Sequence, residues 1–379
     1  MESRLMNILH IVNDYNHTKV HKNLIGSFDK LKFSQTVYIP LRRFSDRGNN
    51  EFEFSNSNSN FIYSDLLKKS HRFLFRRKIS FLFNYLIKNL NVESFDIVHA
   101  STLYSDGALA YRLFCKFGIP YVVTVRNTDL FTFHKIRKDL IFLVRKILKH
   151  ASKIVFISEA NRKYFFSLGW SNSSEFLAKS IVINNGIDEF WLNNIKQYNF
   201  LEREVIRGVY VGRFDDNKNV MQLINAIELF NERSPIKIAL TLVGASGQQH
   251  EEVVKYSENN SWVEYLGQVN DKDKLLNIFR SSSFFIMISK KETFGLVYIE
   301  ALSQGLPIVY TKNQGVDGLT TLKIGEGTDL VIEDIQKSLT KIISEDYSDI
   351  NKLDFSNFSW IGISEKYSNI YLNIRNEKA

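Results

Sequence analysis

Residues 284–311 constrain the fold of this chain more than any other stretch. The apolar run Phe284–Ile288 has the composition of a buried parallel strand. A turn with Gly295 follows, and Leu296–Leu302 has the pattern of a helix ended by the glycine and proline behind it. Another β-rich run, Ile308–Tyr310, comes next. This order of strand, turn, helix and strand predicts an open α/β sheet, in which ligands bind at the carboxyl ends of the strands.

Two glutamates, Glu292 and Glu300, lie on either side of this turn. On one ideal helix, residues eight positions apart would point about 80° apart. We therefore place Glu292 in the loop before the helix and Glu300 inside the helix. In that arrangement both carboxylates face one pocket.

Short β-rich runs alternate with longer helical patterns through the rest of the chain, which predicts doubly wound parallel sheets. The further predicted strands are Asn7–Val12, Thr36–Ile39, Asp96–Ala100, Tyr121–Val125, Lys153–Ile157, Ser180–Ile183, Arg207–Gly212, Lys237–Val243 and Val263–Leu266. The further predicted helices are His21–Lys32, Leu66–Leu90, Ser105–Lys116, Lys135–His150, Glu159–Leu168, Val220–Arg233, Gln249–Tyr256 and Lys272–Phe279.

The length of the chain, 379 residues, is too great for one ordinary core and predicts two domains. Residues 184–203 begin with Asn-Asn-Gly and lack periodicity, so we interpret them as the linker. We expect one domain in residues 1–188 and another in residues 189–359. The aromatic, amphipathic tail, residues 360–379, should pack back on the first domain. Residues 45–60, rich in Asn and Ser, predict a loop.

Several classes of protein are excluded by composition. With 44% hydrophobic and 24% charged residues the chain is globular, and its only cysteine, Cys115, excludes a disulfide framework or a cysteine-based metal site. The apolar segment at the N-terminus is too short for a signal peptide, and no run is long enough for a spanning helix. We therefore expect a cytoplasmic protein.

The net charge of +8 is unevenly distributed. Residues 1–200 hold 29 basic and 16 acidic side chains, whereas the remaining 179 residues hold 20 and 25. The first half therefore favours anionic partners, but no nucleic-acid recognition module is present and we do not expect nucleic acid. Basic residues concentrate in the apolar-rich segments 66–90 and 135–150. These are either ordinary surface helices or a docking surface for an anionic membrane at the inner face of the cell membrane.

A pair of cations follows the first strand of the second half. Arg213 and Lys218 lie just before a predicted helix that Asn219 would cap, so they and the positive helix end would form an anion site. The alternative is that both are solvated loop charges. Gly244 follows the next strand in a similar turn. Asp215 and its acidic neighbour lack a third ligand nearby in sequence, so we expect no metal there.

Three spaced motifs carry a resemblance to a known family. They are V-G-R-F-D-x-x-K-N from residue 211, L-G-Q from residue 266, and S-x-x-E-T-F-G-L-V-Y-I-E-A-L-S-Q-G-L-P-I-V from residue 289. Together they resemble the donor-binding half of the family 4 glycosyltransferases, which have the GT-B fold. N-G-I-D from residue 185 resembles the family's element at the domain junction. The resemblance implies two Rossmann-like domains facing a cleft.

The resemblance also implies roles for individual residues. Arg213 and Lys218 match the pair that neutralises the diphosphate of a nucleotide sugar, Glu292 the residue that binds donor-sugar hydroxyls, and Glu300 the residue that binds the ribose. The other residues expected to contact the donor are Phe294, Gly295, Leu296 and Gly244 near sugar and phosphate, and Gly267, Gln268 and Val269 near the base.

The chemistry expected of such an enzyme needs no cofactor or metal beyond the donor itself. Cleavage of the bond to the diphosphate develops negative charge on the leaving phosphate, which cations and amides can stabilise. The resemblance implies that transfer retains the anomeric configuration and that the acceptor proton passes to the leaving phosphate. It favours a UDP-sugar over a GDP-sugar.

The first half departs from the common family pattern. Many relatives place a histidine after the strand that here ends at Val125, whereas this chain has Arg126, Asn127 and Asp129, similar to a variant in bacterial surface-polysaccharide members. We expect these three to line the cleft, Arg126 and Asp129 as catalytic candidates. His99 either points at the cleft or is a structural histidine. The first loop, with Asn16, lacks the usual paired glycines and is expected to contact the acceptor.

The sequence thus predicts a retaining glycosyltransferase that moves a hexose or N-acetylhexosamine from a nucleotide diphosphate sugar to a glycan or lipid-linked glycan, in bacterial surface polysaccharide synthesis. Two alternatives stay open. One is another GT-B enzyme, such as a nucleotide-sugar epimerase or sugar phosphorylase. The other is a non-catalytic relative that binds membrane or partner enzymes.

Overall fold

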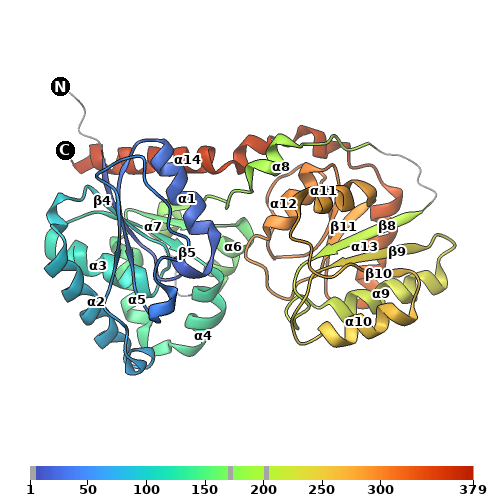
Figure 1. Cartoon of the computed structure of the whole chain (residues 1–379), viewed down its shortest axis with the longest axis horizontal. Coiled ribbons are helices and arrows are strands. Elements are labelled where there is room, and N and C mark those ends of the chain that lie inside the picture. The colour runs from blue at the N-terminus through green and yellow to red at the C-terminus, as the bar shows by residue number, and fades with distance from the viewer. Residues whose placement is uncertain (1–5, 170–173, 200–204, 379) are drawn as a thin grey trace. The chain divides into compact units, whose positions relative to one another are not determined.

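The computed structural model describes residues 6–169, 174–199 and 205–378, and Figure 1 shows its helices and strands. The chain divides into two compact units. Unit 1 combines Met1–Ile157, Arg162–Gly186 and Trp360–Ala379. Unit 2 combines Ser158–Asn161 with Ile187–Ser359.

Unit 1 is built on a seven-stranded parallel sheet in the order β3-β2-β1-β4-β5-β6-β7. The chain direction across the sheet reverses between β1 and β4, which is the switch point at which open sheets bind ligands. The strands are β1 Asn7–Ile11, β2 Ser34–Ile39, β3 Asn60–Tyr63, β4 Ile97–Ala100, β5 Tyr121–Val125, β6 Lys153–Phe156 and β7 Ser180–Val182.

The α-helices that accompany this sheet are α1 Lys19–Lys30, α2 Phe75–Asn89, α3 Ser105–Phe117, α4 His134–Ile136, α5 Ile141–His150, α6 Glu159–Ser167, α7 Ser174–Lys179 and α14 Trp360–Lys378. Among them, α14 comes from the end of the chain and packs against α1 (Figure 1). Its residues Ile363, Tyr367, Tyr371 and Ile374 share a buried cluster with Phe28. The apolar face of the tail is therefore part of the core of unit 1.

Unit 2 is built on a six-stranded parallel sheet in the order β10-β9-β8-β11-β12-β13. Its switch point lies between β8 and β11. The strands are β8 Ile206–Val211, β9 Ile238–Val243, β10 Val263–Tyr265, β11 Phe284–Met287, β12 Ile308–Thr311 and β13 Gly325–Thr328. The helices are α8 Glu189–Asn193, α9 Val220–Arg233, α10 His250–Asn259, α11 Lys272–Ser281, α12 Leu296–Ser303 and α13 Ile332–Ser344.

Shorter helical turns connect these elements. They are the 3₁₀ turns Tyr15–His17, Phe44–Asp46, Lys69–Arg72, Val92–Ser94, Lys138–Leu140, Ser348–Lys352 and Phe355–Phe358, and the π-helical segment Thr128–Phe133.

The predicted α/β class and the two parallel sheets are confirmed, with local differences. The helix predicted over 66–90 is a 3₁₀ turn followed by α2, and the one predicted over 135–150 is split between α4, a 3₁₀ turn and α5. The predicted linker, 184–203, contains α8; its last residues, 200–203, lie outside the described part of the chain. Strand β3 begins at the last residue of the predicted loop.

Strand β13 was not predicted because its sequence, Gly-Glu-Gly-Thr, has no apolar pattern. It forms through backbone pairing with β12, in which Gly325 lies opposite Ile308. A Cβ on Gly325 would lie 1.9 Å from the carbonyl oxygen of Ile308, so a side chain cannot fit there. The glycine that weakens the sequence signal is the residue that allows the strands to approach.

Candidate active site

The switch point of unit 2 brings together the loop after β8 and the loop after β11. Two hydrogen bonds join them: the amide of Lys290 donates to the carbonyl oxygen of Asn217 at 2.7 Å, and the Asn217 side chain donates to the carbonyl oxygen of Lys291 at 2.9 Å. The loops are therefore held at a fixed distance. Residues predicted from separate motifs meet here.

Lys218 and Glu292 form the central contact of this site. Lys218 Nζ lies 2.6 Å from Glu292 Oε2, and the two side chains are 21% and 13% exposed. The backbone of Glu292 is fixed on both sides, since its amide donates to Gln314 and its carbonyl oxygen accepts from Gly315. A cation and a carboxylate, both mostly enclosed, thus form a pair that a polar ligand could replace with its own groups.

Arg213 extends from the end of β8 and pairs with Asp215. Its side chain is 72% exposed, so its guanidinium is available to an anion from solvent. The other carboxylate oxygen of Asp215 accepts from the amide of Lys218 at 3.0 Å. Asp215 therefore orients both predicted cations.

The predicted capping of α9 is wrong in one respect. Asn219 occupies the N-cap position with φ of 61°, but its side chain makes no capping hydrogen bond. Instead Gln249 Oε1 accepts from the amides of Val220 at 3.0 Å and Met221 at 3.3 Å. Two of the amides expected to attract an anion are thus already bonded, and the predicted site retains mainly its two cations.

The start of α12 offers the amides that α9 does not. Gly295 occupies its N-cap position with φ of 75° and no side-chain cap. A Cβ there would lie 2.6 Å from the ring of Tyr298, so the turn needs glycine. Phe294 is buried and stacks on Phe358, which leaves its backbone rather than its ring for a ligand. Leu296, the first helical residue, is partly exposed.

Glu300 lies one turn further along α12 and is partly buried. Burial raises its pKa to about 7, and the charge of Asp188 adds to this, whereas Lys272 and a hydrogen bond from Trp191 act in the opposite direction. Glu300 is therefore close to half-ionised near neutral pH. As predicted, Glu292 precedes the helix and Glu300 lies within it.

Glycine turns continue along the same edge of the sheet. A Cβ on Gly244, after β9, would lie 1.8 Å from the carbonyl oxygen of Gly212. The amide of Gly244 donates to the carbonyl oxygen of Gly267, after β10, at 2.8 Å. Gln268 is exposed and Val269 is half-buried. Residues 267–269 therefore form the outer end of this edge, two strands away from Arg213.

In unit 1, Asp129 is a fixed part of the loops rather than a free group. It is buried, and its carboxylate accepts from the amides of Arg126, Leu103 and Tyr104. Burial raises its pKa to about 6 against the effect of these bonds. Arg126 Nε donates to the carbonyl oxygen of Ser101 at 2.9 Å. Asp129 thus ties the loops after β4 and β5 together, which corrects its prediction as a catalytic group.

His99 is a structural histidine. It is buried in β4, with Nε2 3.0 Å from Thr124 Oγ1 and Nδ1 2.8 Å from the hydroxyl of Tyr371 in α14. Burial holds its pKa well below the usual value, so the ring is neutral. Of the two alternatives left open by the sequence, the structural one fits these contacts.

Asn16 and Asn127 present a different picture. Each has a buried side-chain carbonyl oxygen that bonds to no other protein group in the described chain. Such unpaired oxygens cost free energy unless a ligand or water satisfies them. Both residues therefore stay candidates for contact with a substrate in unit 1.

Sequence reasoning missed a buried ionic cluster near these loops. Lys78, grouped with the basic surface residues, is 5% exposed, and its Nζ lies 2.9 Å from Ser105 Oγ and 3.3 Å from Asn13 Oδ1. Beside it Asp106 is 1% exposed, and burial raises its pKa. The signal was available, since Lys78 shares the helical spacing of the buried α2 residues.

Known sequence families cover nearly the whole of both units. Residues 29–189 match the family described as Glycosyltransferase Family 4, and residues 193–345 match Glycosyl transferases group 1. The chain belongs to the family 4 glycosyltransferases. The order of the two matches is the order of the two units.

Two relatives show the range of this glycosyltransferase family. An uncharacterised glycosyltransferase of Methanocaldococcus jannaschii is 26% identical over 71% of this chain and 72% of its own length. The capsular polysaccharide biosynthesis glycosyltransferase CapH of Staphylococcus aureus is 27% identical over 59% of this chain and 61% of its own length.

Solved structures confirm the GT-B fold of the glycosyltransferase. Sucrose-phosphate synthase from Thermosynechococcus elongatus matches with a TM-score of 0.72 at 16% identity, over 97% of this chain and 99% of that one. Anabaena HepE in complex with UDP matches with a TM-score of 0.65 at 15% identity, over 96% and 99% of the two chains. At such identities the likeness concerns the fold alone.

Proposed function

We propose that this glycosyltransferase moves a hexose or N-acetylhexosamine from a nucleotide diphosphate sugar to a glycan or a lipid-linked glycan in surface polysaccharide synthesis. The observation that carries the proposal is the Lys218–Glu292 contact at the switch point of unit 2. A diphosphate would draw Lys218 away from its carboxylate, and sugar hydroxyls would donate to the Glu292 oxygens released. One pair would thus recognise both ends of the scissile bond.

The proposed reaction depends on stabilising the leaving group. The bond between the anomeric carbon and the diphosphate oxygen breaks, and a bond to the acceptor oxygen forms on the same face of the sugar. Lys218, Arg213 and the amides at the start of α12 would stabilise the charge that develops on the diphosphate. The acceptor proton would pass to the leaving phosphate. Glu292 would bind and orient the sugar.

The nucleoside would occupy the other end of the same edge. Glu300 would bind the ribose hydroxyls, and Gly267, Gln268 and Val269 would contact the base. UDP is favoured because the related fold of HepE was solved with UDP bound. In unit 1, Asn16, Asn127 and Arg126 would contact the acceptor or the donor sugar.

Glu300 makes donor binding depend on pH. With a pKa of about 7 in the free protein, it is mostly protonated at about pH 6 and mostly ionised at about pH 8. Because ribose hydroxyls donate better to the ionised form, UDP-glucose should bind about fivefold more tightly at the higher pH. Calorimetric titrations across this range should give a flat profile for Glu300→Gln. An equal slope in that variant would contradict the role.

The same raised pKa has a consequence for stability of the opposite sign. Between its usual pKa and about 7, Glu300 is protonated in the folded state and ionised in the unfolded state. The contribution of Glu300 to the free energy of unfolding is therefore greatest at low pH and falls as the pH rises towards 7.

Transfer itself tests the proposed function. Purified protein, a panel of labelled UDP-, GDP- and ADP-sugars and a glycan or lipid-linked glycan acceptor should give labelled acceptor product with one nucleotide class. Epimerised free donor would instead support an epimerase, and dependence on added phosphate would support a phosphorylase. Absence of nucleotide binding in a thermal-shift screen would support the non-catalytic relative.

The membrane is the proposed location of the acceptor. No helix in the described part of the chain is long and apolar enough to cross a membrane. However, segments 66–90 and 135–150 carry unusually exposed apolar side chains among their cations: Phe73 is 77% exposed and Ile136 is 71% exposed. Exposed apolar groups flanked by basic ones are typical of surfaces that dock on anionic lipid.

Vesicle flotation tests this docking surface. Replacing Phe73 and Ile136 with aspartate should reduce binding to anionic vesicles by about tenfold or more, since each loses its apolar contact with the lipid. The control replaces Ile236 and Val331, two exposed aliphatic residues of unit 2, with aspartate and changes the net charge equally. Equal flotation of the two variants would refute the surface.

A further inference from the structure

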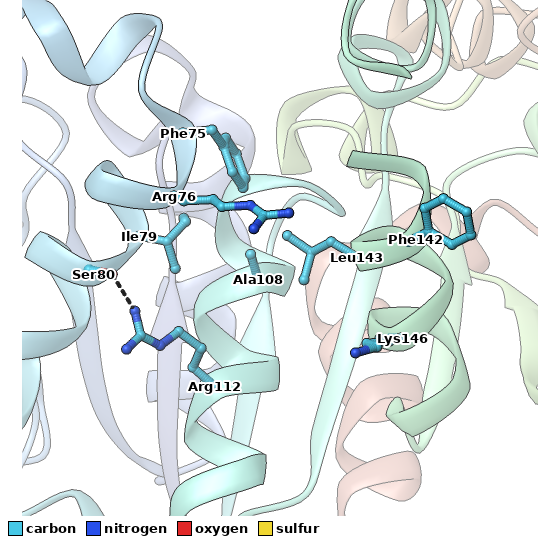
Figure 2. Close-up of a pocket in the computed structure, with 9 residues that line it drawn as sticks. All are labelled: Phe75, Arg76, Ile79, Ser80, Ala108, Arg112, Phe142, Leu143 and Lys146. Carbon is cyan, nitrogen blue, oxygen red and sulfur yellow. Dashed lines mark hydrogen bonds between the residues drawn. The ribbon is translucent and has the colours of Figure 1, made fainter. Parts of the chain in front are cut away.

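A groove lies between three helices of unit 1, away from every residue assigned so far to the donor. It has a volume of about 370 Å³. Figure 2 shows its walls: α2 on one side, α3 at the base and α5 on the other. Its lining residues are Phe75, Arg76, Ile79, Ser80, Ala108, Arg112, Phe142, Leu143 and Lys146.

The groove is apolar along its length. Phe75, Ile79 and Ala108 are buried beneath it, and Leu143 is partly exposed. Phe142, at the rim, leaves 74% of its surface in water, which is costly for a phenylalanine unless something covers it. A hydrocarbon chain would cover these side chains.

Three cations border this apolar surface, and no acidic residue lines it. Arg112 is held in place by a 2.8 Å hydrogen bond to Ser80 and lies over the ring of Phe83. Arg76 and Lys146, on opposite walls, form no ion pair with any residue in the described ranges. In Figure 2 the Arg76 side chain extends from α2 towards Leu143 on α5. Positive charge without acidic partners favours an anionic ligand.

We propose that this groove binds the phosphate and the adjoining hydrocarbon chain of a lipid phosphate, and that it thereby holds the lipid part of the acceptor. This deepens the proposed function, on which the word acceptor rests. Charge complementarity decides the occupant: free phosphate would leave the apolar lining uncovered, and an uncharged chain would leave Arg76 and Lys146 unpaired. The exposed Phe73 and Ile136, close in sequence to the lining segments, place the same lipid surface nearby.

Calorimetry with dodecyl phosphate, kept below its critical micelle concentration, tests the groove directly. The variant Arg76→Ala/Lys146→Ala removes the two unpaired cations, and Arg77→Ala/Arg145→Ala removes their neighbours on the same helices. All four residues are exposed, and only the first pair lines the groove. We expect the first variant to bind about tenfold or more weakly, since each lost contact is a charge-assisted hydrogen bond. The second should bind as the natural protein does.

Two further ligands separate the parts of the probe. Inorganic phosphate carries only the anion, and dodecyltrimethylammonium carries the chain with the opposite charge, so neither should compete with dodecyl phosphate. Equal losses in both double variants, or competition by phosphate alone, would overturn the proposal.

Leu143→Asp provides an independent variant, because it places a negative charge in the apolar part of the groove. It should weaken binding of dodecyl phosphate without changing binding of UDP, whose proposed site is in unit 2. Unchanged binding of dodecyl phosphate in this variant would also overturn the proposal. Loss of UDP binding in all forms of the protein would count against the proposed function and not against the groove.

Discussion

Replacing Glu292 with alanine should lower the rate of sugar transfer by about 10²- to 10³-fold, the usual effect of removing one preorganised polar contact in an active site. The donor sugar would lose its hydrogen-bond acceptor and its orientation. Binding of UDP, which lacks the sugar, should persist or tighten, because Lys218 would no longer be neutralised by the carboxylate 2.6 Å away. The measurement is transfer from a labelled donor, with UDP affinity from calorimetry.

Two companions keep this result interpretable. Glu258→Ala removes an exposed carboxylate from α10 in the same unit and should leave transfer unchanged. Glu292→Gln preserves the size of the side chain, and its amide oxygen can still accept, so its rate should lie between the other two. Turnover by Glu292→Ala close to that of the natural protein would refute the assigned role, provided that its melting temperature is normal.

Replacing Lys218 with alanine should affect binding and transfer together. Loss of a charge-assisted contact to phosphate should weaken UDP binding by about 10- to 100-fold. Transfer should fall further, because the developing charge on the diphosphate would lose a cation that acts most strongly in the transition state. Opposite effects on UDP binding in the Glu292 and Lys218 variants would show that the two residues bind different parts of the donor.

The matched control for this variant is Lys290→Ala. Lys290 is exposed and lies on the loop that carries Glu292, but its contact with the other loop uses only its backbone amide. Its removal lowers the net charge equally and should leave UDP affinity within about twofold, as for other screened surface charges. An equal loss in both lysine variants would indicate a general effect of charge instead of a specific phosphate contact.

The fold could be predicted because its signals are local. Strands β5 and β11 are short, continuous apolar runs, and α9 keeps helical spacing over its whole length, so each element is visible in its own residues. Strand β13 is not, because backbone pairing with β12 stabilises it without an apolar pattern. The helices predicted over 66–90 and 135–150 were drawn too long because basic and apolar residues continue through the turns that interrupt them.

The site divides in the same way. Lys218 and Glu292 could be predicted to act together because each follows a central strand, and neighbouring strand ends share one edge of the sheet. The cap of α9 could not, since Gln249 lies 29 residues from Val220. The role of His99 depends on Tyr371, which is 272 residues away. Lys78 was assigned to the surface from its charge, although its helical position is on the buried face of α2.

The return of α14 to unit 1 has a consequence for the order in which this protein can fold as it is made. Domains generally fold as units during synthesis, the first one first. Here all of residues 187–359 leave the ribosome before Ile363, Tyr367, Tyr371 and Ile374, which complete the core of unit 1. Unit 2 can therefore finish first. Until the last residues arrive, the newborn chain exposes the apolar surface around Phe28 and must be kept from aggregating.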